Sequence, residues 1–415
     1  MSLTVLGADL DGTVGGVRCE DGRIAEIGPG VAGREGDEVI EADGAALVSP
    51  LLNGHTHAAM TLFRGYGDDL PLMRWLQEKI WPAEAKLEPE DVYWGTRLAC
   101  VEMIRTGTTR FWDMYWHPHA TARAVADAGL RAVIGAPLID AAGGPGALRE
   151  TAVESVEELG GLDPRIAPAL APHAIYTVGE ESLGWIAELG EERGVPVQIH
   201  LSETRGEVED CLREHGVRPA LYLDRLGLLG ERTLLAHGVW LDREELELIA
   251  ARGATVVTNP VANQKLAVGG VFPYPQARAA GVAVGLGTDG AGSNNSLDML
   301  ADAKAFALIQ KHAAADAAAV TAGESWEIAT GRRAPLLGAG DGLVPGGPAD
   351  FLLLRPRAHE LALGDRRAGL VYAASGSVVE ATVVAGRVLM RGGTVPGADE
   401  VIARAVERAE RLGLR

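Results

Sequence analysis

The chain has 415 residues, of which 47% are hydrophobic and 23% charged, the balance of an ordinary globular protein rather than of a disordered, collagen-like or coiled-coil chain. Its formal net charge of −19 disfavours nucleic acid or an anionic membrane surface as a partner. Three widely spaced cysteines give no disulfide framework, and no signal peptide or membrane-spanning run is visible, so we expect a cytoplasmic protein.

Both ends of the chain are predicted to be rich in β-strands. Residues 22–28 alternate apolar and polar side chains after an Asp-Gly turn, and residues 347–392 contain further short apolar runs. We therefore expect segments 1–46 and 339–395 to pair into one small β-sandwich domain. A charged amphipathic helix is expected within 396–415.

Residues 47–338 follow another pattern, in which short apolar runs alternate with mostly helical stretches. The eight runs span residues 47–54, 108–115, 130–139, 165–173, 195–201, 233–241, 254–260 and 282–289. Continuous apolar strands that alternate with helices are typical of a parallel sheet buried on both faces. Eight such units predict an α/β fold of the TIM type, a (β/α)8 barrel. A doubly wound open sheet is the alternative. Such a sheet typically has a glycine-rich phosphate-binding loop after an early strand, and none is found in the sequence.

Polar side chains gather where five of these predicted strands end. They are His55 and His57 on the first strand, His173 on the fourth, His200 and Glu203 on the fifth, His237 on the sixth and Asp289 on the eighth. The active site of a barrel forms at this end of its strands, and residues i and i+2 of a strand share one face. His55, His57, His200 and Asp289 can therefore share one ion, and three nitrogens with one carboxylate suit Zn²⁺ or Fe²⁺.

Other polar residues near the strand ends admit simpler interpretations. No lysine lies between Lys86 and Lys265, so the fourth strand offers no lysine for a bridging carbamate, and we expect one metal ion. The second His-x-His, residues 117–119, is interpreted as a loop because it contains proline. Asp113 is either a partner of a metal-binding histidine or a structural hydrogen-bond acceptor, and residues 293–295 resemble a helix N-cap.

Eight motifs spread over the barrel carry a family resemblance. They are NGHTHAAMTLFRG (53–65), WLQEKIWPAE (75–84), FWDMY (111–115), APHAIYT (171–177), HLSET (200–204), AHG (236–238), NPVANQKLAVG (259–269) and LGTDGAGSNNSLDML (286–300). Together they resemble the amidohydrolase superfamily and, within it, the 5′-methylthioadenosine/S-adenosylhomocysteine deaminases. Guanine deaminases and triazine hydrolases look similar in the same motifs, so both remain alternatives. A barrel that has lost catalysis is a further alternative, but such a chain should have lost ligands.

The resemblance implies a hydrolytic deaminase of an aminopurine nucleoside, with one divalent metal ion, zinc or alternatively iron, per chain. By that resemblance the metal ligands are His55, His57, His200 and Asp289. Glu203 would shuttle protons to the purine, and Asp289 would accept a proton from the attacking water. His237 would hydrogen-bond that water or the developing oxyanion.

The resemblance also implies where the small-molecule substrate binds. Glu84 would grip the ribose hydroxyls, His173 would contact the substrate, and Trp75 would line the nucleoside pocket. The third strand ends at residues 136–140 without the arginine that often reads a distal carboxylate in the family, which leaves Arg149 as a single distal anchor. We therefore expect a neutral 5′ group to be preferred over S-adenosylhomocysteine. A homo-oligomer is compatible with the sequence.

Overall fold

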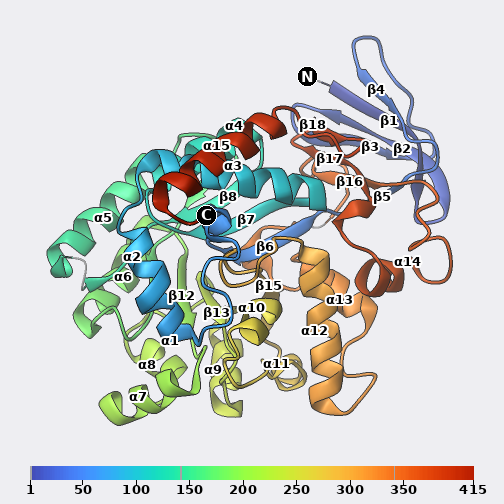
Figure 1. The fold of residues 1–415 in the computed structure, drawn as a ribbon. Helices are drawn as coiled ribbons and strands as arrows, with labels where there is room; N and C mark the ends of the chain where they lie inside the picture. The colour runs from blue at the N-terminus through green and yellow to red at the C-terminus, as the bar shows by residue number, and fades with distance from the viewer. Residues whose placement is uncertain (1, 141–142, 341) are drawn as a thin grey trace.

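The computed structural model describes residues 2–140, 143–340 and 342–415, and its central strands alternate with helices as predicted (Figure 1). All eight predicted runs contain strand, and the third and fourth runs each contain two short pieces. The central strands are β6 (Leu51–Thr56), β7 (Thr108–Met114), β8 (Arg131–Gly135), β9 (Pro137–Leu138), β10 (Ile166–Pro168), β11 (Ala171–Pro172), β12 (Val197–Leu201), β13 (Thr233–His237), β14 (Thr255–Thr258) and β15 (Ala283–Leu286).

The central strands are parallel and lie in chain order around the barrel. One sheet has the order β6-β7-β8-β10, a short one pairs β9 with β11, and another has the order β12-β13-β14-β15. A bridge between Leu170 and Val197 connects the first group to β12. On the other side, the backbone N–H of Asp289 donates to the carbonyl of His55 over 3.0 Å, which brings the end of β15 beside β6. The fold is therefore the predicted α/β barrel rather than an open sheet.

Helices follow the central strands and cover the outside of the barrel. The longer ones are α3 (Pro89–Thr106), α4 (Pro118–Ala128), α5 (Gly144–Leu159), α6 (Glu180–Arg193), α7 (Arg205–His215), α8 (Pro219–Arg225), α9 (Arg243–Arg252), α10 (Pro260–Lys265), α11 (Tyr274–Ala280), α12 (Met299–Ala314) and α13 (Ala322–Ala329). Two local predictions were wrong. His119 lies in the first turn of α4 and pairs with Glu158, and the N-cap of α12 is Asp298 rather than a residue of 293–295.

Apolar side chains fill the barrel below its polar rim. A buried cluster there includes Leu52, Trp112, Leu234 and Val257, which come from four different strands, with Leu337 from the segment after α13. Each of these side chains is at most 3% exposed. This apolar layer separates the histidines and Asp289 at the carboxyl end of the barrel from its other end.

The two ends of the chain pair as predicted, and their strands form one continuous sheet rather than the two separate sheets of a sandwich. Its strands are β1 (Ser2–Leu10), β2 (Thr13–Glu20), β3 (Arg23–Gly28), β4 (Glu38–Glu41), β5 (Ala46–Val48), β16 (Phe351–Leu354), β17 (Val379–Val384) and β18 (Arg387–Arg391). β5 pairs antiparallel with β16 and so joins the two halves, which share one hydrophobic core. The domain boundaries at residues 46, 338 and 395 stay a prediction.

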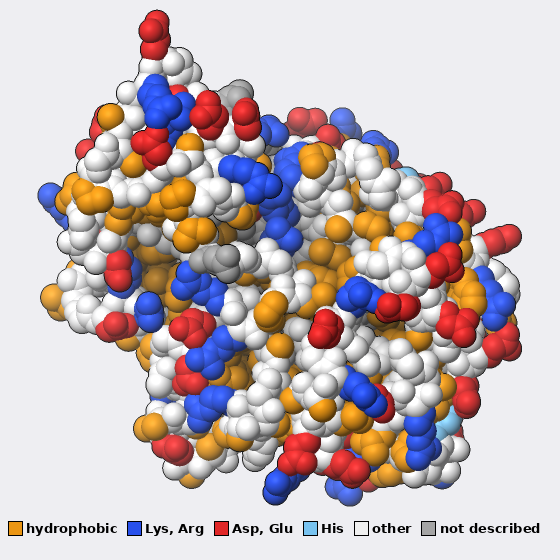
Figure 2. Space-filling model, turned by 180° about the vertical axis from the view of Figure 1, so that it is seen from behind, with side chains coloured by type: hydrophobic (Ala, Val, Ile, Leu, Met, Phe, Trp, Pro, Cys, Tyr) orange, Lys and Arg blue, Asp and Glu red, His pale blue; other side chains and the backbone are white. Residues whose placement is uncertain are grey.

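The C-terminal helix and the surface complete the fold. Helix α15 (Ala398–Leu412) packs along α3 (Figure 1), and its Arg411 pairs with the buried Asp91. On the face seen in Figure 2, acidic and basic side chains are interspersed. Among the helices that the structure describes, none is long and apolar enough to cross a membrane.

Candidate metal centre and active site

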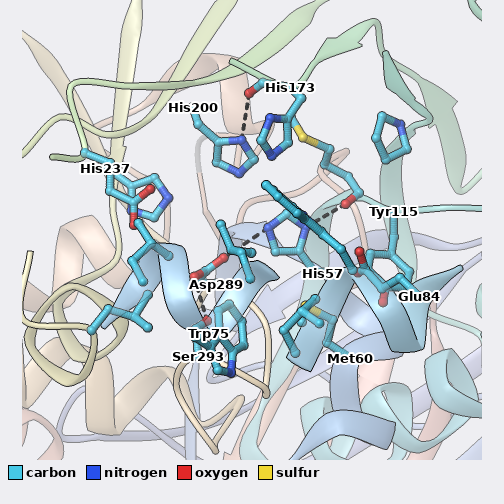
Figure 3. A pocket seen from close by; sticks show the side chains of 18 of the residues that line it. His57, Met60, Trp75, Glu84, Tyr115, His173, His200, His237, Asp289 and Ser293 are labelled. Atoms are coloured by element: carbon cyan, nitrogen blue, oxygen red, sulfur yellow. Dashed lines mark hydrogen bonds and ion pairs between the residues drawn. The ribbon is translucent and has the colours of Figure 1, made fainter. Parts of the chain in front are cut away.

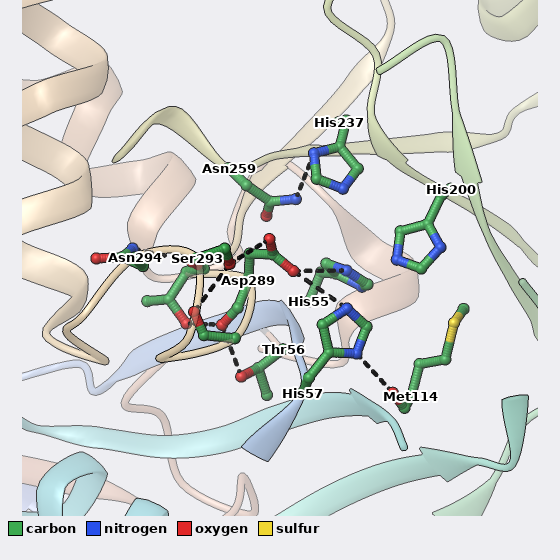
Figure 4. A network of polar contacts seen from close by, with 12 residues as sticks. His55, Thr56, His57, Met114, His200, His237, Asn259, Asp289, Ser293 and Asn294 are labelled. Carbon is green, nitrogen blue, oxygen red and sulfur yellow. Dashed lines mark hydrogen bonds and ion pairs between the residues drawn. The ribbon is translucent and has the colours of Figure 1, made fainter. Parts of the chain in front are cut away.

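Three histidines and one aspartate meet at the carboxyl end of the barrel (Figure 4). His55 lies in β6 and His57 directly after it, His200 lies in β12, and Asp289 follows β15. The Oδ1 atom of Asp289 is 3.1 Å from Nε2 of His57 and 3.6 Å from Nε2 of His55. His55, His57 and His200 each offer a ring nitrogen within 4.8 Å of the others. The structure therefore brings the four predicted ligands together at one end of the barrel, where His55 also forms a second such group with His237 and Asp289.

Hydrogen bonds to carbonyl groups orient two of the histidine rings. Nδ1 of His57 lies 2.6 Å from the carbonyl oxygen of Met114, and Nδ1 of His200 lies 2.7 Å from that of His173. If each Nδ1–H donates there, Nε2 is left as the free lone pair. Both ring nitrogens of His55 are buried and have no hydrogen-bond partner. Because orphaned buried nitrogens are costly, this donor set fits a divalent metal ion.

A network on the other side of the site fixes Asp289. Ser293 donates its hydroxyl proton to Oδ2 of Asp289 over 2.6 Å, which leaves Oδ1 for the histidines. Asp289 has a left-handed backbone with φ of 61°. The hydroxyl of Thr56 donates to the carbonyl oxygen of Asp289 over 2.9 Å. Such a backbone is unfavourable for a residue other than glycine and persists where surrounding contacts hold it. Residues 293–295, interpreted as a cap, thus contribute a residue that positions the carboxylate.

Burial and the carboxylate together determine the charges of these groups. Burial lowers the pKa of His55 to about 4 and that of His200 well below its usual range. Burial also lowers the pKa of His57, but the adjacent Asp289 carboxylate more than offsets this and brings it to about 9. Despite burial, the adjacent rings of His55 and His57 hold the pKa of Asp289 well below its usual range. His55 and His200 are therefore neutral, as metal ligands must be, whereas His57 has to give up a proton to bind a metal cation.

Glu203 and His237 lie together beside this cluster. Oε1 of Glu203 is 3.9 Å from Nδ1 of His237, and that nitrogen also lies 2.8 Å from Oδ1 of Asn263. Glu203 is 8% exposed, and burial raises the pKa of its carboxyl group. A raised pKa suits a residue that must both donate and accept a proton near neutral pH. Sequence reasoning missed Asn263, although it lies in one of the motifs that carry the resemblance.

Three of the four predicted ligands, His57, His200 and Asp289, line one cavity (Figure 3). Trp75 and Glu84 come from the helical segment after β6, formed by α1 (Leu72–Trp75), η2 (Leu76–Ile80) and α2 (Trp81–Glu84). The lining residues are His57, Met60, Leu72, Trp75, Leu76, Ile80, Trp81, Glu84, Met114, Tyr115, Trp116, Pro137, His173, Tyr176, His200, Glu203, His237, Leu266, Asp289 and Ser293. The cavity therefore places the predicted ligands opposite a mainly apolar and aromatic wall, a lining typical of small-molecule sites.

Sequence reasoning did not single out several aromatic residues of this wall. Tyr115, Trp116 and Tyr176 line the cavity with the predicted Trp75. Burial raises the pKa of Glu84, and the neighbouring side chains of Tyr115 and Trp116 favour its ionised form. Two of the three aromatic residues lie within motifs that carry the resemblance, but no periodicity marks them as lining residues.

The structure places Arg149 away from the cavity and gives Asp113 a contact with the backbone. Arg149 is not among the residues that line the cavity. It lies on α5, where it forms an ion pair of 2.8 Å with Glu181 and stacks over Trp185, so we leave it out of the proposed site. Asp113 accepts the backbone N–H of Ala58 over 2.6 Å. This bond holds the chain just after His57, in agreement with the interpretation of Asp113 as a structural hydrogen-bond acceptor.

Comparisons with known proteins agree with this architecture. Residues 47–389 match the model of the amidohydrolase family. The chain belongs to the amidohydrolase family. It is 47% identical over 399 residues to 5′-deoxyadenosine deaminase of Methanoregula boonei, with 94% of this chain and 90% of that protein covered. It is 43% identical over 404 residues to 5-methylthioadenosine/S-adenosylhomocysteine deaminase of Moorella thermoacetica, with 95% and 94% covered.

A solved structure resembles this amidohydrolase over its full length. It is an adenosine deaminase from Xanthomonas campestris with bound zinc, which is 34% identical in sequence. The match has a TM-score of 0.92 and covers 100% of this chain and 98% of the other. This amidohydrolase therefore combines the fold of a zinc-containing relative with a His/Asp cluster able to hold a metal ion.

Proposed function

We propose that this amidohydrolase is a hydrolytic deaminase of adenine nucleosides that carry a small neutral 5′ group. We further propose one zinc ion per chain, with His55, His57, His200 and Asp289 as ligands. The observation that carries the proposal is that these predicted ligands and the buried Glu203 meet at one cavity, which all of them except His55 line. The names of the deaminases that share 43–47% of its sequence support the nucleoside class.

The residues around the ligand set can prepare the attack on the purine ring. When bound, zinc supplies Lewis acidity and makes the attacking water acidic enough to lose a proton near neutral pH. Asp289, held by Ser293 through one oxygen, can accept that proton at Oδ1. His237 can donate a hydrogen bond to the oxygen that develops on C6 of adenine, provided that its proton is on the nitrogen that faces the substrate.

Glu203 supplies the proton transfers that complete the reaction. In its protonated form it donates to N1 of the purine while C6 is attacked, so that negative charge does not accumulate on the ring. The proton that Asp289 took from the water then passes through Glu203 to the exocyclic nitrogen, the C–N bond breaks and ammonia leaves. As the carbonyl forms at C6, the hydroxyl proton returns Glu203 to its protonated form. The raised pKa of this buried carboxyl group favours the protonated form from which it donates.

The opposite wall of the cavity provides groups for the sugar and the base. Glu84 is buried beside Tyr115 and Trp116, and its carboxylate can accept hydrogen bonds from the ribose hydroxyls. Trp75 is 5% exposed and offers an apolar face to the nucleoside. His173 lines the same cavity, and its Nδ1 lies 3.0 Å from the Thr177 hydroxyl, which leaves Nε2 for substrate.

The charges of the lining support the preference for a neutral 5′ group. Among the described residues that line the cavity none is lysine or arginine, whereas Glu84, Glu203 and Asp289 are carboxylates. A phosphate or a carboxylate on the substrate would find no lysine or arginine there to pair with. The 5′ groups that fit are therefore hydrogen, hydroxyl and methylthio.

We also propose that the protein works in the cytoplasm. Cys19, Cys100 and Cys211 are free, buried thiols, and burial raises the pKa of each of them. Free thiols of this kind are typical of a reducing compartment. A homo-oligomer stays a prediction, which light scattering of the purified protein would measure.

Ammonia release from a panel of substrates tests the proposed function. We expect turnover of 5′-deoxyadenosine, 5′-methylthioadenosine and adenosine, followed by loss of the adenine absorbance band. Guanine and chlorotriazines, the substrates of the alternative hydrolases, should react far more slowly. Faster release of ammonia from guanine, or of chloride from a triazine, would overturn the proposal, and no turnover of any of them would favour a barrel without catalysis.

A further inference from the structure

Glu207 lies in the first turn of α7, outside the lining of the cavity, but it is bonded to the proposed proton shuttle. Its side chain is buried, with 7% of the residue exposed. Oε1 accepts the backbone N–H of Ser202 over 2.8 Å, and Oε2 accepts the backbone N–H of Glu203 over 2.9 Å. Both carboxylate oxygens are thus used to hold the two residues that join β12 to α7.

This use of the glutamate differs from an ordinary helix cap. In α3, α9 and α13 the acidic residue at the same position, the third of the helix, bonds back to the N–H of the N-cap residue. In α7 the N-cap is Thr204, whose hydroxyl accepts the N–H of Glu207 over 3.2 Å. The Glu207 carboxylate does not accept the N–H of the N-cap residue. It accepts instead the N–H groups of Ser202 and Glu203, the two residues before the N-cap. The contact therefore serves the turn that precedes the helix.

That turn needs external support because of its backbone conformation. Ser202 has φ of 52°, a left-handed value that is unfavourable for a residue other than glycine. The turn also determines where the Glu203 side chain leaves the chain. A carboxylate that accepts both of its amide protons holds Ser202 and Glu203 in one conformation.

The same turn is bonded to the segment that carries His237. The N–H of Gly238 donates to the carbonyl of Leu201 over 3.0 Å, and the N–H of Trp240 donates to that of Ser202 over 2.9 Å. Residue 237 also has a left-handed backbone, with φ of 76°. Movement of the Ser202 peptide would therefore be transmitted to both partners of the 3.9 Å contact between Glu203 and His237.

We propose that Glu207 is a positioning residue, which fixes the Glu203 carboxylate relative to His237 and the substrate ring. The inference rests on the proposed function, since it assigns to Glu207 the geometry of the proton shuttle. Its physical basis is that a general acid must lie within hydrogen-bond reach of the atom that it protonates. A displacement of about 1 Å at a catalytic group reduces the rate by about 10²-fold.

Glu207→Gln in the zinc-loaded protein tests the assignment, because the amide has the same shape but turns an NH2 group toward one of the two N–H donors. We expect kcat for 5′-deoxyadenosine to fall by about 10²-fold, with KM and zinc content close to those of the wild type. The loss should be smaller with 6-chloropurine riboside, since chloride leaves without a proton. A purely structural residue would not distinguish the two leaving groups.

Glu245→Gln is the matched control. Glu245 occupies the same position in α9, is 0% exposed, and accepts the N–H groups of Ala220 and Asp242 as well as Arg218. We expect this variant to lower the melting temperature and to leave kcat within about twofold of the wild type. If Glu207→Gln fails to fold, Glu207→Asp keeps the charge but cannot reach both amides, so it should show a smaller decrease in kcat with the same dependence on the leaving group.

The outcomes separate this inference from the proposed function. Absence of deamination by the wild type would overturn the proposed function itself. An active wild type with a folded Glu207 variant that matches the Glu245 control in kcat would overturn the positioning role. A variant that loses zinc, or that slows both leaving groups equally, would also overturn it, because either result indicates a general structural contribution.

Discussion

Oδ1 of Asp289 lies 3.1 Å from Nε2 of His57, although the two residues follow the last and the first central strands of the barrel. The contact forms only because the barrel brings β15 beside β6, where the N–H of Asp289 donates to the carbonyl of His55. Asn53 strengthens this junction through hydrogen bonds with the hydroxyl and the N–H of Thr288. The candidate metal centre therefore depends on the completed fold rather than on any local segment.

Glu203→Gln should abolish deamination while the metal stays bound. The amide cannot deliver a proton to the purine, and a general acid or base typically contributes about 10²–10⁴-fold to the rate. We expect kcat for 5′-methylthioadenosine to fall within that range and the zinc content to remain that of the wild type. Turnover near the wild-type rate would show that another group shuttles the proton.

S-adenosylhomocysteine should be a poorer substrate than 5′-methylthioadenosine. Its distal carboxylate finds no lysine or arginine among the described lining residues, and we expect kcat/KM to be lower by about tenfold or more, the equivalent of about 1.4 kcal/mol. Arg149→Ala should leave this ratio unchanged, because Arg149 pairs with Glu181. Equal use of both substrates, with a selective loss for S-adenosylhomocysteine in that variant, would restore Arg149 as the distal anchor.

Lys265→Met should weaken substrate binding more than it slows chemistry. Nζ of Lys265 donates to Oδ1 of Asp68 and of Asn295 over 2.7 Å each, which ties the chain before α1 to the loop after β15. That chain leads to Trp75. A hydrogen bond between charged groups contributes about 1.5 kcal/mol or more, so we expect KM to rise by about tenfold with kcat little changed.

Lys311→Met provides the control for this substitution. Lys311 lies near the end of α12 and donates to the carbonyl of Ala317, far along the chain from the segment that leads to Trp75. Steady-state kinetics of both variants should show a raised KM only for Lys265→Met. A decrease in kcat with unchanged KM would contradict a role in holding the wall of the cavity.

The sequence predicted the elements of the fold more completely than the details of the site. The eight apolar runs were informative because strands buried on both faces need continuous apolar residues, and the histidines stood out against them. Arg149 was assigned from the resemblance alone, and its pairing with Glu181 depends on how α5 packs beside α6. Ser293 was interpreted as a cap because its neighbours are typical cap residues, whereas tertiary contact directs its hydroxyl to Asp289.

Residues that act through backbone geometry were beyond sequence reasoning. In the sequence Glu207 is an ordinary acidic residue in the first turn of a helix. Its contact with the N–H of Ser202 depends on the left-handed backbone of that residue, which the sequence does not reveal. Asn263 is equally inconspicuous until the fold brings it to His237. Single-sequence patterns report burial and periodicity, but they do not report such long-range partners.

The buried Asp302 should make stability depend on pH. Burial raises its pKa to about 7, although Asn294 and the N–H of Val261 donate to the carboxylate. Since this folded-state pKa lies above that of an unfolded aspartate, the folded protein retains a proton that the unfolded chain releases. The contribution of Asp302 is therefore fully present below about pH 4 and is lost as the pH rises to about 7.

Asp302→Asn removes this titration and allows its size to be measured. The free energy of unfolding of the wild type, relative to that of the variant, should fall by roughly 2–3 kcal/mol between pH 5 and 7. Denaturant unfolding of both proteins at each pH gives the difference, in which groups common to both cancel. A difference that is constant or that grows with pH would show that the carboxyl group is ionised throughout.

The most direct test of the central claim is a zinc titration of the metal-free protein, followed by ammonia release from 5′-deoxyadenosine. We predict no activity without metal, a linear rise as zinc is added, and a break at one equivalent per chain. His200→Ala should neither bind zinc stoichiometrically nor regain activity. Full activity of the metal-free protein, a break at two equivalents, or stoichiometric zinc in His200→Ala would contradict a single ion held by His55, His57, His200 and Asp289.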